Sequence, residues 1–227
     1  KKEAKQIAYL SIEASVNMAG GQPFSLRNLR EVRKISKKYR IPLYLDVTRI
    51  FENAYFIKKR EKGYQNKTVR QITREITALS DGCTMSAKKD AAANIGGFLA
   101  MNSAEFFRKA KEMVVAYEGL HTYGGMAGRD MEAVAIGLKE FSRDEEVAYY
   151  ISQVQYLGEQ LEKNGIPIVR PIGAHAVFID AKYFLPHISQ KHFPAQRLVA
   201  EIYIESGVRT MERGIVSGQH GEEPYDG

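Results

Sequence analysis

Short apolar segments alternate with amphipathic helical segments along the first half of the chain. Apolar runs of strand length occupy residues 7–12 and 43–45, and further short runs lie at 83–85 and 98–100. Runs this short are typical of strands that are covered on both faces. Right-handed crossovers between such strands give a mainly parallel sheet with helices on both faces. The alternation therefore predicts the α/β class.

The helices of this half are marked by their N-caps and by their apolar spacing. Ser25 precedes apolar residues that recur at helical spacing, with arginine and lysine between them. Thr68 and Gln71 form a capping-box pair at the start of another helix, and Ser103 opens a third. These elements make up a predicted first domain over residues 1–142.

The second half has a different pattern. Residues 126–164 are almost entirely helical, with a break near Ser142. A strand is expected at 176–179 and a helix at 195–206. This predicts part of a smaller α+β domain over residues 143–227, with the boundary near Ser142.

Composition excludes several classes of protein. The net charge of +6 comes from 33 basic and 27 acidic residues, and the basic ones are spread along amphipathic helices, so a solvated surface is favoured over nucleic-acid binding. A single cysteine, Cys83, excludes an internal disulfide and favours a reducing compartment such as the cytoplasm. No apolar run approaches the ~20 residues of a membrane span, and the start lacks the apolar core of a signal peptide.

Both ends resemble cuts in a longer protein, the polar segment 218–227 in particular.

Two ionisable side chains follow strands of the predicted sheet. In such sheets ligands bind beyond the carboxyl ends of the strands. Asp46 alone is as compatible with a helix cap as with a ligand contact, and Lys88 and Lys89 alone are better explained as solvated surface lysines. Together, Asp46 and Lys89 have the layout of a pyridoxal phosphate site, in which a lysine forms the Schiff base and a carboxylate pairs with the ring nitrogen. Ser86 could donate a hydrogen bond to the phosphate.

Seven segments carry a resemblance to a known family. They occur in order along almost the whole chain: 16–23, 46–49, 52–58, 86–90, 122–132, 173–178 and 193–196. Together they resemble the β-eliminating lyases of the fold-type I pyridoxal phosphate enzymes, a family that includes tyrosine phenol-lyase and tryptophanase. The resemblance implies a three-layer αβα large domain, like that of aspartate aminotransferase, and part of a small α+β domain.

The resemblance also implies roles for cofactor-binding residues. Lys89 matches the Schiff-base lysine that also transfers the substrate proton, and Asp46 matches the partner of the pyridine nitrogen. Asn17 and Arg49 match contacts to the ring 3′-oxygen. Ser86 matches a phosphate ligand.

Four further residues are implied around this centre. Lys88 adds positive charge near the phosphate, and Asn94 matches a residue whose main-chain carbonyl binds a monovalent cation, commonly potassium. Tyr123 matches an active-site tyrosine that could relay a proton. His175 is placed either near the substrate or in the core as a satisfied histidine. The remaining histidines show no metal-ligand spacing.

Residues 211–214 bear on the substrate. They resemble the tyrosine-cleaving members, in which Arg213 faces the phenol ring, and this favours β-elimination of L-tyrosine to phenol, pyruvate and ammonia. Ala87 departs from that pattern and is shared with tryptophanase, so elimination of indole from L-tryptophan remains an alternative. A plainer interpretation of Arg213 is an ion pair with Glu212 or Glu205.

The family also implies an assembly. Its members are homotetramers with cofactor sites between subunits, and their chains are about twice as long as this one. The absent parts supply other phosphate ligands, a ring-stacking aromatic residue and an arginine that binds the substrate carboxylate. A catalytically inert fragment or relative therefore stays a second alternative, and the isolated 227 residues are expected to bind cofactor poorly.

Overall fold

The computed structural model describes residues 6–213, so the polar segment 218–227 lies outside the described residues. Four strands form one sheet in the order of the chain. They are β1 (Leu10–Glu13), β2 (Leu43–Asp46), β3 (Gly82–Ser86) and β4 (Gly97–Met101). The first three are parallel and β4 is antiparallel to β3. The predicted α/β class with a mainly parallel sheet is confirmed.

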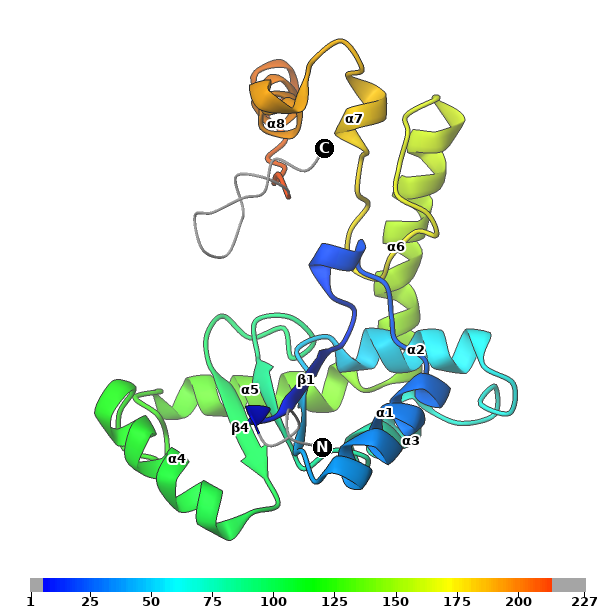
Figure 1. Cartoon of the computed structure of the whole chain (residues 1–227). Helices are drawn as coiled ribbons and strands as arrows, with labels where there is room; N and C mark the ends of the chain where they lie inside the picture. Colours follow the sequence, from blue (N-terminus) through cyan, green and yellow to red (C-terminus); the bar gives the residue numbers. More distant parts are fainter. Residues whose placement is uncertain (1–5, 214–227) are drawn as a thin grey trace.

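Helices connect and follow these strands. They are η2 (Asn17–Ala19), α1 (Leu26–Tyr39), α2 (Ile50–Arg60), α3 (Val69–Thr77), α4 (Ala104–Tyr117), α5 (Gly128–Phe141), α6 (Asp144–Lys163), α7 (Ala181–Phe184), η3 (Gln190–His192) and α8 (Pro194–Ser206). In Figure 1, α1, α2 and α3 gather on one side of the strands, whereas α5 passes behind them. Within residues 6–213, no helix combines the length and the apolar character that a bilayer crossing needs.

Local capping explains where several helices begin. The Ser25 side chain accepts a hydrogen bond from the Asn28 backbone N–H at the start of α1. Thr68 and Gln71 make the predicted capping box at the start of α3. The predicted break near Ser142 separates α5 from α6.

Two expectations differ from the structure. Residues 176–179 do not form a strand; the segment makes only an isolated bridge between Ile168 and Ile179. An apolar run becomes a strand only where a neighbouring strand can pair with it. Helix α2 is not among the predicted elements. The residue before it, Arg49, makes no side-chain cap hydrogen bond, so the local sequence carries no N-cap signal there.

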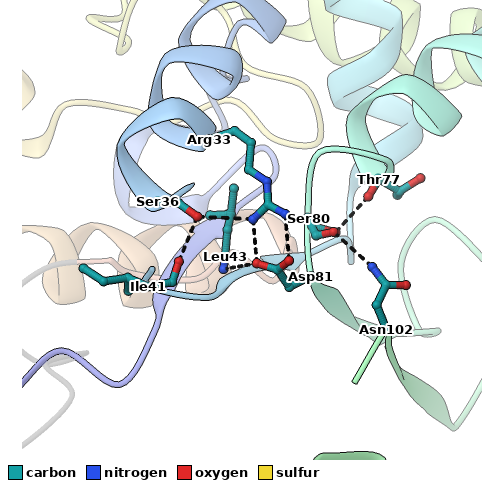
Figure 2. A network of polar contacts seen from close by, with 8 residues as sticks. All are labelled: Arg33, Ser36, Ile41, Leu43, Thr77, Ser80, Asp81 and Asn102. Carbon is teal, nitrogen blue, oxygen red and sulfur yellow. Dashed lines mark hydrogen bonds and ion pairs between the residues drawn. The ribbon is translucent and has the colours of Figure 1, made fainter. Parts of the chain in front are cut away.

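A polar network holds α1 to the amino ends of β2 and β3. The Arg33 guanidinium donates to both carboxylate oxygens of Asp81, at 2.5 and 2.7 Å, and the Leu43 backbone N–H donates to Asp81 at 2.8 Å. Ser36 donates to the Ile41 carbonyl in the same cluster (Figure 2). The ligand-binding edge of a parallel sheet is the opposite one, so this network belongs to the scaffold.

Helix α6 connects the sheet to the last helices. Its first residue, Asp144, lies 2.5 Å from Lys58 of α2 and accepts a hydrogen bond from the Val69 backbone N–H. Val147 and Ile151 on its next turns belong to the same core as the sheet residues. Figure 1 shows α6 leading away from the sheet toward α7 and α8. The domain boundary near Ser142 stays a prediction.

Candidate active site

Strands β2 and β3 bring their following loops to one edge of the sheet. Asp46 ends β2 and its Cα partner in β3 is Thr84, two residues before the last residue of β3, Ser86. The Val47 backbone N–H donates to the Thr84 carbonyl at 2.8 Å. The segments that carry Asp46 and Lys89 therefore leave two neighbouring strands at the same edge of the sheet.

Thr48 joins these two loops. Its hydroxyl accepts a hydrogen bond from the Ser86 backbone N–H at 3.0 Å, and its carbonyl accepts one from the Asp90 backbone N–H at 3.4 Å. Its own N–H donates to Asp46 Oδ1 at 2.9 Å. One buried threonine thus fixes the Asp46 carboxylate and the loop that holds Lys89.

Asp90 makes a second connection between the loops. Its Oδ2 accepts hydrogen bonds from the backbone N–H groups of Phe51 at 2.6 Å and Glu52 at 3.4 Å. It therefore caps the N-terminus of α2 from the residue beside Lys89. Burial, and then the neighbouring Glu52 carboxyl, raise the pKa of Asp90. Sequence reasoning gave Thr48 and Asp90 no role; their only signal was their place in the matching segments.

The Lys89 amine is tuned by its surroundings. Its Nζ lies 3.4 Å from Ser86 Oγ. Burial lowers the pKa of Lys89, the positive charges of Lys88 and Arg49 lower it further, and the Asp46 carboxylate acts in the opposite direction. A lowered pKa increases the fraction of neutral amine, which is the form that attacks a carbonyl or accepts a proton.

Arg49 is buried where α2 begins. Its Nη1 lies 3.9 Å from Glu13 Oε1 at the end of β1. Burial and the charge of Asp46 raise the pKa of Glu13, although Arg49 lowers it. The guanidinium supplies a fixed positive charge between the ends of β1 and β2 and the Lys89 loop.

His175 comes from the second half of the chain. The Ala174 backbone N–H donates to the Gly21 carbonyl at 3.1 Å, which holds the next residue beside the turn after η2. His175 Nε2 makes a close hydrogen-bond contact with Asn17 Oδ1, and Nδ1 lies 3.4 Å from Glu52 Oε2. The structure thus brings Asn17 and His175 together, and it adds Glu52, to which sequence reasoning gave no role.

Two cavities meet at Arg49 and His175. The first, of about 340 Å³, is also lined by Lys88, Lys89 and Glu52. The second, of about 420 Å³, is also lined by Asn17 and Arg213. Arg213 Nη2 lies 3.1 Å from the Met18 sulfur. The geometry therefore connects the Lys89 side of the site with the Arg213 side.

The remaining predicted residues are not part of the walls of these cavities. Within residues 6–213, Asp46, Ser86, Asn94 and Tyr123 do not line either one, although the charge of Asp46 acts on Lys89. Tyr123 is 41% exposed in the turn after α4. Asn94 is exposed on the loop after Lys89. In the described part of the chain, no group of three or more histidine, cysteine, aspartate or glutamate side chains could hold a metal.

Comparison with known proteins decides the family. The family model described as Beta-eliminating lyase matches residues 1–223. The chain belongs to the β-eliminating lyases. This membership confirms the resemblance carried by the seven segments.

Curated relatives of this β-eliminating lyase share more than half of its residues. A tyrosine phenol-lyase from Symbiobacterium sp. (strain SC-1) is 58% identical over 226 residues, which cover 98% of this chain and 49% of the relative. A tyrosine phenol-lyase from Fusobacterium nucleatum subsp. nucleatum is 56% identical over 214 residues, which cover 94% of this chain and 46% of the relative. The chain thus spans about half the length of these relatives.

Solved structures show the fold of this β-eliminating lyase. A protein from Listeria monocytogenes EGD-E described as an L-allo-threonine aldolase has a TM-score of 0.60 at 22% identity, over 91% of this chain and 52% of that one. A lyase/threonine aldolase structure from Exiguobacterium sp. 255-15 has a TM-score of 0.56 at 22% identity, over 74% of this chain and 42% of that one. The predicted αβα fold class is confirmed.

Proposed function

We propose that this chain carries the cofactor-binding centre of a pyridoxal phosphate-dependent lyase that converts L-tyrosine to phenol, pyruvate and ammonia. The observation that carries the proposal is the meeting of the Lys89 cavity and the Arg213 cavity at Arg49 and His175. The name shared by the relatives, tyrosine phenol-lyase, supports the choice of substrate.

The donor set fits pyridoxal phosphate. An aldehyde needs an amine, and Lys89 offers one whose pKa is lowered. A protonated ring nitrogen needs a carboxylate, and Asp46 is held at the end of β2 by the Thr48 N–H. A phenolate oxygen needs donors, which Arg49 and Asn17 supply. The Ser86 hydroxyl and the Lys88 ammonium suit a phosphate.

The residues of the two cavities then have stated tasks. Bound pyridoxal phosphate supplies an electron sink for negative charge on the substrate α-carbon. Lys89, as a neutral amine, accepts the α-proton and can return it. Arg213 faces the phenol side of the substrate and stabilises negative charge that develops there. His175 lines both cavities and borders the bound amino acid, whereas Tyr123, which lines neither cavity, receives no task within this chain.

Covalent trapping tests the cofactor assignment. Borohydride reduction of the full-length protein loaded with pyridoxal phosphate, followed by peptide mapping, is expected to place the cofactor on Lys89. The matched variants are Lys89→Arg, which is expected to lose the label, and Lys88→Arg, which is expected to keep it. Label on Lys88, or none in the wild type, would refute the enzyme assignment and favour an inert relative.

A substrate panel tests the reaction. Pyruvate should form from L-tyrosine, and Arg213→Ala should reduce this activity much more than activity on S-alkylcysteines, because only the phenol needs the guanidinium. Ala87 is the observation that favours the alternative, since tryptophanase shares this alanine. Faster release of indole from L-tryptophan would establish that alternative.

Three further assignments belong to the proposal. The Asn94 carbonyl binds a monovalent cation, so exchange of potassium for a larger organic cation should lower activity. The full-length protein forms a homotetramer, which its molar mass in solution tests. The cytoplasm is its compartment, which cell fractionation tests.

A further inference from the structure

Two buried polar atoms near the site have no hydrogen bond. Glu52 Oε2 and His175 Nδ1 are both unpartnered in the part of the chain that the structure describes. They lie 3.4 Å apart, on side chains that are only 6% and 9% exposed. Buried polar atoms almost always have a partner, so each of these two is the available partner of the other.

The contact with Asn17 indicates which nitrogen of the His175 ring carries a proton. The contact of His175 Nε2 is with the Asn17 carbonyl oxygen, which can only accept. In this orientation of the Asn17 amide, a hydrogen bond between the two side chains requires a proton on Nε2. A single further proton placed between Nδ1 and the Glu52 carboxyl completes the contact on the other side of the ring.

Burial favours the neutral form of the Glu52 carboxyl and so places this proton on Glu52. The groups facing the pair are Arg49 at the start of α2, Glu13 at the end of β1, Asp90 on the Lys89 loop and Tyr150 on α6. Burial raises the pKa of Glu52 to about 8, although Arg49 acts in the opposite direction.

The histidine responds to the same surroundings. Burial, and then Arg49, lower the pKa of His175 to about 4, although Glu13 opposes this. Near pH 7 the imidazole is therefore neutral and its Nδ1 accepts from the protonated Glu52 carboxyl.

We propose that Glu52 is a positioning residue, which donates to His175 Nδ1 and thereby makes His175 Nε2 a donor to Asn17, so that the Asn17 amide presents its NH2 group to the cofactor. This inference rests on the proposed function, in which Asn17 contacts the ring 3′-oxygen. Among residues 6–213 no hydrogen bond occupies the Asn17 NH2 group, and Asn17 lines the cavity that Arg213 lines.

Loss of the Glu52 donor has a defined consequence. The neutral imidazole is then free to carry its proton on Nδ1, which turns Nε2 into an acceptor. An acceptor beside Asn17 favours rotation of the amide by half a turn, which points NH2 at His175 and the carbonyl at the cofactor oxygen. Two oxygens then face each other where a hydrogen bond is needed.

The tautomer is measured without the cofactor. Solid-state ¹⁵N NMR of the histidine-labelled, cofactor-free full-length protein near pH 7, assigned with His175→Asn, should show the Nε2–H form. Glu52→Gln keeps a donor and should keep this form, whereas Glu52→Leu should give a substantial Nδ1–H population. Glu105→Gln on exposed α4 is the matched control and should resemble the wild type.

Cofactor affinity provides the second readout. Titration with pyridoxal phosphate should give a dissociation constant for Glu52→Gln within about threefold of wild type, and one at least about tenfold weaker for Glu52→Leu, which corresponds to about 1.4 kcal/mol. Nδ1–H in the wild type, or an unchanged tautomer in Glu52→Leu, would overturn the positioning role alone. If Glu52→Leu fails to fold, the wild-type tautomer still decides. The expected tautomer in a wild type that binds no pyridoxal phosphate would instead refute the proposed function.

Discussion

Gly137 in α5 packs directly against the loop that carries Lys89. A Cβ atom built on Gly137 would lie 1.7 Å from the Ala91 carbonyl oxygen and 2.7 Å from its carbonyl carbon. Ala91 is completely buried and lies two residues after Lys89. We therefore expect Gly137→Ala to affect stability and cofactor binding together.

The size of the effect follows from two opposing contributions. Alanine in place of glycine favours a helix interior by about 1 kcal/mol. Against this, contact between Cβ and oxygen requires α5 or the loop to move by more than about 1 Å, and overpacking of this kind costs about 1–3 kcal/mol or more. Because the obstacle is backbone, no change of rotamer relieves it. A contact of 1.7 Å with backbone belongs at the upper end of that range, so we expect a net loss of about 1–2 kcal/mol, which lowers the Tm by about 2–8 °C for a domain of this size.

Gly128→Ala provides a control in the same helix. A Cβ atom at Gly128 meets nothing within 4 Å, so this variant should be as stable as the wild type or slightly more stable. Thermal unfolding followed by circular dichroism compares the two, and titration with pyridoxal phosphate should show weaker binding only for Gly137→Ala. Equal Tm values and affinities for both variants would refute the claim that α5 supports the Lys89 loop.

Substitutions at three other positions test the scaffold. Thr48→Val removes the acceptor of the Ser86 N–H and should lower the free energy of unfolding in urea by about 1–3 kcal/mol. The same variant should bind the cofactor more weakly, and unchanged affinity would contradict the role of Thr48. Ile72 is completely buried, so Ile72→Ala should cost about 2–5 kcal/mol and Ile72→Val about 0.5–1.5 kcal/mol; equal losses would contradict its close packing. The hydrogen bonds from Arg33 lower the pKa of Asp81, so its contribution is present above the ordinary pKa of about 3.9 and is lost as the pH falls through the folded-state value. Asp81→Asn should lower the urea midpoint at pH 7 and flatten its decline below pH 4, and an unchanged decline would contradict the assignment.

Local signals were enough to predict some helices and not others. The Ser25 and Thr68 caps lie within three residues of the N–H groups that they bind, so the sequence shows both partners at once. Helix α2 is capped by Asp90, which is 39 residues from Phe51 in the sequence. No window of neighbouring residues contains that pair, and the helix was therefore missed.

Strand pairing posed the same difficulty. The apolar segment at 176–179 has the composition of a strand, but it finds only the bridge to Ile168. The antiparallel direction of β4 likewise depends on how the chain returns from the Lys89 loop, which alternation of apolar runs does not encode. Composition predicts which segments suit a strand, and the tertiary structure decides which of them have a partner.

Some residues of the candidate site can likewise be found from local sequence signals, and others only from the tertiary structure. Asp46 and Lys89 could be found because each follows a predicted strand, whereas Glu52 becomes significant only when a residue from the second half of the chain, His175, is placed beside it. The residues that fix the loops are also residues that stabilise the fold, since Thr48 and Asp90 hold buried backbone groups. Stability and cofactor affinity should therefore fall together when Thr48 is changed. They should separate at Asp81, which supports the sheet from the edge opposite the site.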